Sequence, residues 1–179
     1  IIASFGVVTL FIGTVQSMKQ SDGKRLLAYS SIGQLGYIVF AIGNSLFLLH
    51  TESEALHLLA LIAILGAAYH VLNHAVFKGL LFLTSGSVLY ATGTKDLNRL
   101  GGLLKLMPIS AFAAGIASLS IAGVPPFSGF SSKWTIISSS LLAGSEAIFL
   151  IIFGIIALFT SAITLSCYVK FFGMTFTSA

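Results

Sequence analysis

The chain contains little charge and almost no cysteine. Of its 179 residues, 8% are Asp, Glu, Lys or Arg and 56% are apolar. A soluble domain is about 25% charged, so nine basic and five acidic side chains are too few to cover a water-soluble globule of this size. The abundance of Leu, Ile, Val and Phe excludes disorder. The net charge of +4 does not indicate a nucleic-acid partner. The composition therefore predicts an integral membrane protein.

The single cysteine, Cys167, limits the chemistry that the chain can perform. One thiol excludes a disulfide framework and a Cys-x-x-Cys metal or redox site. We expect Cys167 to be a small buried residue, and the sequence indicates no cofactor.

Five regions are apolar enough to cross a bilayer, which takes roughly 20 residues each. We predict an all-α membrane protein with one domain, 1–179, and helices at about 1–18, 26–49, 54–91, 108–142 and 146–173. The third helix exceeds the ~30 Å hydrocarbon core, so it tilts, projects from the membrane, or kinks near Gly66 or Gly79. The first helix lacks a leading Met and a basic flank and does not read as a signal peptide. We expect the chain to be a fragment of a longer protein.

The fourth region contains two consecutive prolines, Pro125 and Pro126. They lack backbone donors and clash with carbonyls four residues back, those of Ile121 and Ala122. The region is therefore either two short spans joined by a turn or one span broken midway.

The charges of the loops decide between these alternatives. Loops 19–25 and 92–107 and the end at Lys170 contain Lys and Arg, whereas the loops between them contain only Glu52, Glu54 and Glu146. Only if 108–142 is one broken span do all these Lys and Arg residues fall on one side, and the other side then has three acids and no base. Cytoplasmic loops are enriched in Lys and Arg, so we predict five spans with the basic side cytoplasmic.

Three titratable residues, His70, His74 and Lys78, lie in apolar sequence at a spacing of four. On a helix each step of four advances by about 40°, so they form one slanting stripe. Histidine changes charge near neutral pH and burial favours neutral lysine, so the stripe predicts a proton relay. The alternatives are interhelical hydrogen bonds, a metal site on the two histidines, which lacks a nearby carboxylate or thiol, and a Lys78 that reaches an interface.

Lys133 lies seven residues after Pro126, also in apolar sequence. A lysine at the centre of a membrane helix costs about 2.5–3.5 kcal/mol, so it is a functional candidate by default. Irregular backbone at that depth is tolerated only where it is buried in protein or lines a watered cavity. The helix that restarts near 128–132 presents its positive dipole end, which favours loss of the Lys133 proton. The alternative is a proline kink with a lysine hidden in an interface.

The second helix contains the polar side chains Tyr29, Ser30, Ser31, Gln34 and Tyr37. Small and amide side chains are also ordinary contacts between membrane helices, so this signal is weak alone. Lys24 lies where this helix begins. It is either a proton entry group or an anchor on the positive side.

Four strings, DGKRLLAYSSIGQLGYI, HVLNHAVFKGLLFLTSGSV, DLNRLGGL and GVPPFSGFSSKW, together resemble one family. It comprises the antiporter-like subunits shared by respiratory complex I, energy-converting membrane-bound hydrogenases and Mrp-type cation/proton antiporters. The second and third strings resemble the hydrogenase and Mrp branches. The resemblance implies a fold of two inverted five-helix repeats, of which this chain is the second, with the broken helix at 108–142.

The resemblance also assigns roles to individual residues. Lys24 matches the lysine of the family's D-x-K-R motif, and His70 and His74 match its histidine pair. Lys78 matches the lysine one turn later, and Lys133 the charged residue of the broken helix. These residues are then the proton relay.

The function implied is half of a proton-translocating membrane subunit in a redox-driven pump such as a NADH-quinone oxidoreductase or a membrane-bound hydrogenase. No redox chemistry is expected in this chain. The partners would be other membrane subunits, the N-terminal repeat and the lipid of a prokaryotic plasma membrane. The alternatives are an Mrp-type Na⁺/H⁺ antiporter subunit, a non-conducting structural module, and a membrane metalloenzyme that uses the two histidines.

Overall fold

The computed structural model describes residues 1–145 and 147–178. The helices are α1 (Ile2–Lys19), α2 (Gly23–Leu48), α3 (Glu54–Thr92), α4 (Pro108–Ala122), α5 (Ser128–Leu142) and α6 (Ile148–Phe172), with short helical turns at Leu97–Arg99, Ala143–Ser145 and Gly173–Thr177. No strand occurs in the described ranges. The prediction of an all-α chain with an interrupted fourth helix is confirmed. The expected start of the last helix at residue 146, and Glu146 itself, lie outside the described residues.

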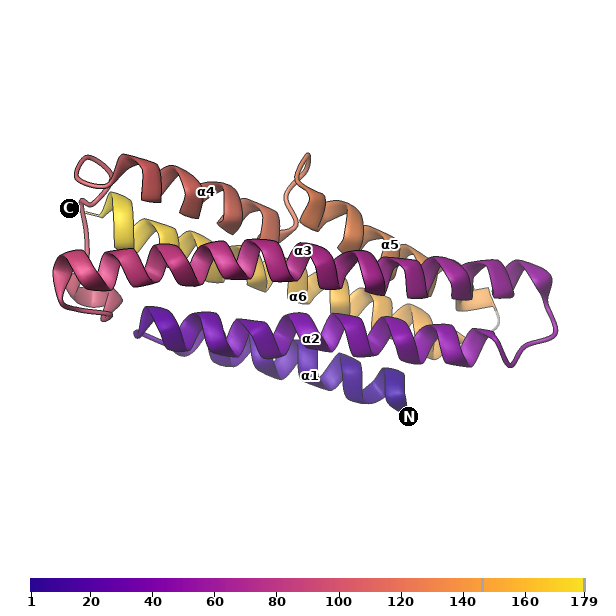
Figure 1. Ribbon diagram of the computed structural model, residues 1–179. Coiled ribbons are helices and arrows are strands. Elements are labelled where there is room, and N and C mark those ends of the chain that lie inside the picture. Colours follow the sequence, from indigo (N-terminus) through magenta and orange to yellow (C-terminus); the bar gives the residue numbers. More distant parts are fainter. Residues whose placement is uncertain (146, 179) are drawn as a thin grey trace.

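The helix axes are roughly parallel or antiparallel to one another (Figure 1). α1 and α2 form an antiparallel hairpin, and α3 returns along α2. α4 and α5 lie end to end along α3, with the irregular segment between them. α6 packs against α1, α4 and α5 and closes the bundle.

Among the described residues, four helices are long and apolar enough to cross a membrane: α1, α2, α3 and α6 with its terminal turn. α4 is a shorter apolar helix. α3 has 39 residues and is uninterrupted at both Gly66 and Gly79. Its length is about 58 Å at 1.5 Å per residue, so it must tilt or project. The number of spans stays a prediction, because α4 and α5 together would make one.

α1 and α2 are in nearly direct backbone contact. A Cβ added at Gly36 would collide with the backbone of Leu10, and one at Gly43 with the backbone of Ala3. Small residues permit such close approach between membrane helices. The larger polar side chains of α2 lie on an adjacent face of the helix, which leaves them available to α3.

α2 begins at Gly23, earlier than the charge-free sequence indicates, because Asp22 caps it. The Asp22 carboxylate accepts hydrogen bonds from the backbone N–H groups of Lys24 at 2.9 Å and Arg25 at 3.1 Å. It also pairs with the Lys95 ammonium at 2.9 Å. A capped first turn holds two charged side chains in helical conformation at the membrane edge. The loop after α3 is thereby tied to the start of α2.

This cap predicts a loss of stability in acid. Partial burial raises the pKa of Asp22, but the Lys95 ammonium and the two backbone N–H groups outweigh it and leave the pKa lowered. A lowered pKa stabilises the fold above the unfolded value of about 3.9, and this stability is lost as the pH falls through the folded pKa. We expect the melting temperature of the detergent-solubilised protein to fall below about pH 4, and to fall less in Asp22→Asn. At pH 7 this variant should lose less than about 1 kcal/mol, because asparagine still caps.

Glu52→Gln, at an exposed position in the loop before α3, is the matched control and should keep the acid dependence of the unaltered protein. An equal acid transition in Asp22→Asn and the unaltered protein would contradict this assignment.

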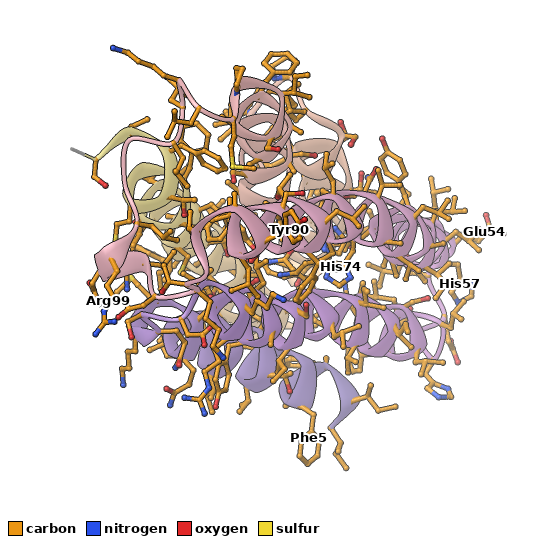
Figure 2. All side chains as sticks on the ribbon, turned by 60° about the vertical axis from the view of Figure 1, so that its left-hand side comes forward. Phe5, Glu54, His57, His74, Tyr90 and Arg99 are labelled. Carbon is orange, nitrogen blue, oxygen red and sulfur yellow. The ribbon has the colours of Figure 1, made fainter. Side chains whose placement is uncertain are left out.

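The two ends of the bundle carry different ionisable residues, and which end faces which side of the membrane stays a prediction. Glu54 and His57 lie at one end and Arg99 at the other (Figure 2). The end that contains Arg99 also contains the turn between α1 and α2 and the C-terminal end of α6. At this end the Lys170 ammonium donates to the carbonyl oxygens of Met18 at 3.0 Å and Gln20 at 2.9 Å, which completes the end of α1.

Candidate functional site

Lys78 is buried between α2, α3 and α6, with 5% of its surface exposed. Its Nζ donates to the carbonyl oxygen of Leu27 at 2.7 Å, to the Tyr168 hydroxyl at 3.0 Å, and to Ser30 Oγ. Nζ also lies 5.7 Å from the centre of the Tyr168 ring. All three hydrogens of an ammonium therefore have an acceptor. Lys78 does not reach toward an interface in this structure.

Lys133 lies in the second turn of α5, beside the break between α4 and α5, and is 2% exposed. Its Nζ donates to the carbonyl oxygen of Ile121 at 2.8 Å and lies 5.1 Å from the centre of the Tyr37 ring. Ser161 Oγ of α6 donates to the neighbouring carbonyl oxygen of Ala122 at 3.2 Å. These are the two carbonyls that the prolines deprive of partners. Lys133 and Ser161 thus supply hydrogen-bond donors to the last carbonyl groups of α4 inside the protein.

His70 is fully buried and joins α3 to two other helices. Its Nδ1 lies 2.9 Å from Ser132 Oγ on α5, and its Nε2 lies 3.2 Å from Gln34 Oε1 on α2. Its ring centre is 6.0 Å from that of Tyr37, the aromatic ring beside Lys133. His70 therefore connects the second helix to the restarted helix.

His74 stacks on His70, with ring centres 6.4 Å apart and planes 15° apart. It lies between α3 and α2 (Figure 2). Within 1–145 and 147–178, His74 Nε2 and Gln34 Nε2 are buried without a hydrogen-bond partner. Buried polar nitrogen atoms of this kind are sites where internal water binds.

The predicted stripe is thus one polar row. It runs along α3 from Lys78 through His74 to His70, and it continues through Ser132 on α5 to the adjacent Lys133. α2 supplies the opposite wall with Ser30 and Gln34.

Lys24 is not part of this row. It lies partly exposed in the first turn of α2, six residues before Ser30, which is about 9 Å along the helix axis. It lines an open polar cleft of about 610 Å³ with Asp22, Lys95 and Arg99. The structure thus places Lys24 at the basic end, beside solvent.

Sequence reasoning missed Tyr168. It indicated that the serines beside Lys133 could hold water and that Ser161 is a packing residue, and it did not identify the hydrogen bonds of Ser132 and Ser161. Each of these hydroxyl groups bonds a partner more than 30 residues away in the chain. The sequence signal for these residues was a hydroxyl group within an otherwise apolar helix. This signal is weak because such residues also pack between membrane helices.

The metal alternative finds no support in the geometry. In the described part of the chain, no three His, Cys, Asp or Glu side chains gather where they could hold a metal ion. Cys167 is a buried free thiol, as expected.

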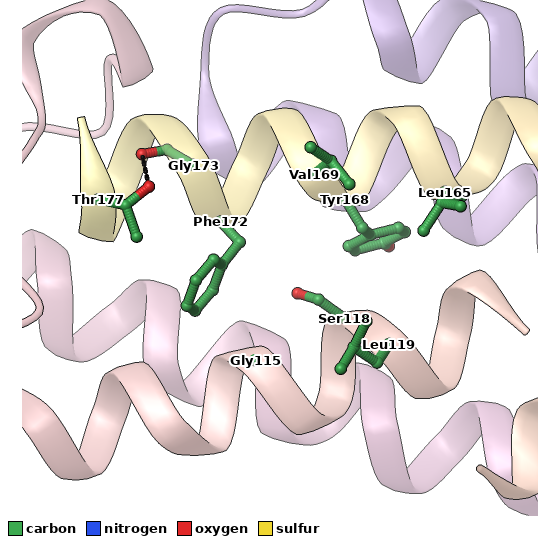
Figure 3. Close-up of a pocket in the computed structure, with 9 residues that line it drawn as sticks. All are labelled: Gly115, Ser118, Leu119, Leu165, Tyr168, Val169, Phe172, Gly173 and Thr177. Carbon is green, nitrogen blue, oxygen red and sulfur yellow. Dashed lines mark hydrogen bonds between the residues drawn. The ribbon is translucent and has the colours of Figure 1, made fainter. Parts of the chain in front are cut away.

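A groove of about 400 Å³ lies beside the row, between α4 and α6 (Figure 3). Of the residues drawn there, only Tyr168 is titratable, and its hydroxyl is the one bonded to Lys78. The groove is apolar apart from the hydroxyls of Ser118, Tyr168 and Thr177. It supplies no second set of titratable groups, so the row remains the candidate site.

Comparisons with known proteins agree with the membrane fold. A family model described as "NADH:quinone oxidoreductase/Mrp antiporter, TM" matches residues 1–164. The Na(+)/H(+) antiporter subunit A1 of Staphylococcus aureus (strain JH9) is 39% identical over 171 residues, which cover 93% of this chain and 21% of that subunit. The chain therefore spans about a fifth of the length of this relative.

Two solved structures are similar over 99% of the chain. In the Mrp complex from Dietzia sp. DQ12-45-1b, the matching subunit is 27% identical with a TM-score of 0.79, and 30% of it is covered. In the membrane-bound sulfane sulfur reductase, an archaeal respiratory membrane complex, the matching chain is 34% identical with a TM-score of 0.81, and 26% of it is covered.

Proposed function

Because the chain belongs to the transmembrane family of NADH:quinone oxidoreductase and Mrp antiporter subunits, we propose that it forms half of an ion-translocating subunit and passes protons along its buried row. One observation carries the proposal: His74 stacks on His70, His70 contacts Ser132 beside Lys133, and Lys78 follows His74 by one helical turn. Among the described residues, Lys78 and Lys133 are the buried side chains that can carry a full charge at neutral pH besides the histidines. Ionisable residues inside a membrane protein mark ion pathways and proton relays by default.

The surroundings of the two lysines allow both protonation states. Burial disfavours the ammonium form, whereas a carbonyl oxygen and a tyrosine ring beside each Nζ favour it. Opposing effects of this kind let a group bind and release a proton without a large change in free energy. Like charges in one row also repel, so a proton that arrives at one group promotes release from the next.

The rest of the ion pathway would lie in segments outside this chain, since it covers 21 to 30% of its relatives. The partners would be other membrane subunits of such a complex. The Staphylococcus aureus relative favours an Mrp-type Na⁺/H⁺ antiporter, and the archaeal respiratory complex favours a redox-driven pump. Flux driven by a sodium gradient, as opposed to an electron donor, would distinguish the two.

The orientation follows from the charged ends. Lys24 and Lys95 line one cleft with Arg99 at the end of the bundle that contains Arg99, and we assign this end to the cytoplasm of a prokaryotic cell, with its plasma membrane around the bundle.

The test replaces His74 in the intact parent complex, reconstituted in liposomes with a pH-sensitive dye inside. We expect His74→Phe to lower proton flux at least about tenfold, since a positioned proton-transfer group contributes a factor of about 10² or more. His50→Phe, in the exposed turn after α2, is the control and should keep the unaltered flux. Full flux in an assembled His74→Phe complex would favour a structural module.

A further inference from the structure

The two nitrogen atoms of His70 have different partners. Gln34 Oε1, which faces Nε2 at 3.2 Å, can only accept a hydrogen bond. Nε2 must therefore carry a hydrogen whenever this contact exists. The state of Nδ1 then decides whether His70 is neutral or charged.

Ser132, the partner of Nδ1, has one hydrogen and two possible acceptors. Its Oγ lies 2.9 Å from His70 Nδ1 and 3.2 Å from the carbonyl oxygen of Gly129. When His70 is neutral, the Ser132 hydroxyl donates to Nδ1. When Nδ1 is protonated, Nδ1–H donates to Oγ and the hydroxyl turns to Gly129. The direction of one hydroxyl therefore follows the charge of His70.

We propose that Gln34 keeps the Nε2 hydrogen of His70 in place, so that His70 exchanges protons with the helix break at Nδ1, through the Ser132 hydroxyl. A proton delivered to Ser132 Oγ forms a new O–H bond as the original hydroxyl proton passes to Nδ1. Ser132 stays neutral and His70 becomes an imidazolium. Release runs the same steps in reverse.

This inference rests on the proposed function and adds a direction to it. Ser132 directly precedes Lys133 in the first turns of α5. The exchanging nitrogen thus faces the restarted helix, and the opposite nitrogen is bound to α2. Protons would pass between His70 and the helix break through Ser132.

The charges around His70 reinforce this order. On its own helix it faces His74, from α5 it faces Lys133, and from α2 the neutral Gln34 and the phenol of Tyr37. A proton on His74 or Lys133 disfavours a second charge on His70. His70 would therefore take up a proton when its neighbours have released theirs.

The first test replaces the hydroxyl in the intact complex in liposomes. Ser132→Ala should lower proton flux at least about tenfold, because positioned proton-transfer groups contribute factors of about 10² or more. Ser132→Thr keeps a hydroxyl and should restore most of the flux. Ser87→Ala, an exposed serine on α3, is the control for loss of a hydroxyl.

The second test changes the partner of Nε2. A carboxylate in Gln34→Glu stabilises the imidazolium, so His70 stays charged to higher pH. We expect the pH profile of flux to move toward alkaline pH by about one unit or more. Gln34→Met removes the acceptor without adding charge and should lower flux without this alkaline shift. Gln16→Met, on the exposed face of α1, is the matched control and should leave flux and profile unaltered.

The outcomes separate this inference from the proposed function. Unaltered flux in Ser132→Ala together with an unaltered profile in Gln34→Glu would overturn the role of Gln34 and Ser132, although loss of flux in Lys133→Met would still support proton transfer by the row. Loss of flux in Ser132→Thr equal to that in Ser132→Ala would also overturn it, because the hydroxyl would then not be what matters.

Discussion

Replacing Lys133 with methionine is expected to reduce proton flux about 100-fold or more, because the row would lose its proton-binding group at the helix break. Methionine keeps most of the length of the lysine stem, which packs against Gly123, where an added Cβ would meet Lys133 Cδ at 3.2 Å. The carbonyl oxygen of Ile121 would lose a donor, at a cost of roughly 1–3 kcal/mol. The complex should still assemble, so co-purification of its subunits would be retained while the fluorescence of an internal pH dye no longer changes.

A second variant at the same position separates a proton carrier from a structural cation. Lys133→Arg keeps a positive charge that is never released in proteins, so we expect it to lose flux as well. Lys105→Met, an exposed lysine in the loop before α4, is the control for loss of one positive charge. If Lys133→Arg supports full flux, Lys133 serves as a fixed charge and the relay proposal is wrong at this residue.

Most of the architecture could be predicted from local features of the sequence. Apolar length predicts helices, and the two consecutive prolines predict a break whose freed carbonyls belong to Ile121 and Ala122. The structure confirms an interrupted fourth helix. Which side chains take those carbonyls was not predictable, since Lys133 and Ser161 reach them from 12 and 39 residues away.

In the candidate site, too, local features could be predicted from the sequence and contacts between distant residues could not. The stripe of His70, His74 and Lys78 depends only on helical periodicity, so it could be found in the sequence. Tyr168 could not, because it is 90 residues from Lys78 and meets it only when α6 packs against the bundle. The sequence also could not decide whether the third helix kinks, because a glycine in a helix costs only about 1 kcal/mol. In the structure α3 continues through both candidate glycines.

Lys78→Met is expected to reduce proton flux by a similar factor, about 100-fold, with little effect on assembly. The surroundings of Lys78 can remain paired without it, because Ser30 Oγ and the Tyr168 hydroxyl bond each other at 2.6 Å. The carbonyl oxygen of Leu27 keeps the Ser31 hydroxyl as a donor at 3.1 Å. The substitution would then leave none of these three groups, Ser30 Oγ, the Tyr168 hydroxyl and the Leu27 carbonyl, without a partner, and unpartnered buried polar groups are a usual reason why such substitutions unfold a protein.

Loss of flux in Lys78→Met would therefore report the missing proton-binding group and not a damaged interior. Lys19→Met, exposed at the end of α1, is the matched control and should transport normally. The measurement is initial proton uptake by the reconstituted complex, normalised to the amount of assembled complex. If Lys78→Met transports normally while Lys133→Met does not, the pathway does not include the Ser30–Tyr168 site, and protons must enter the row at His74.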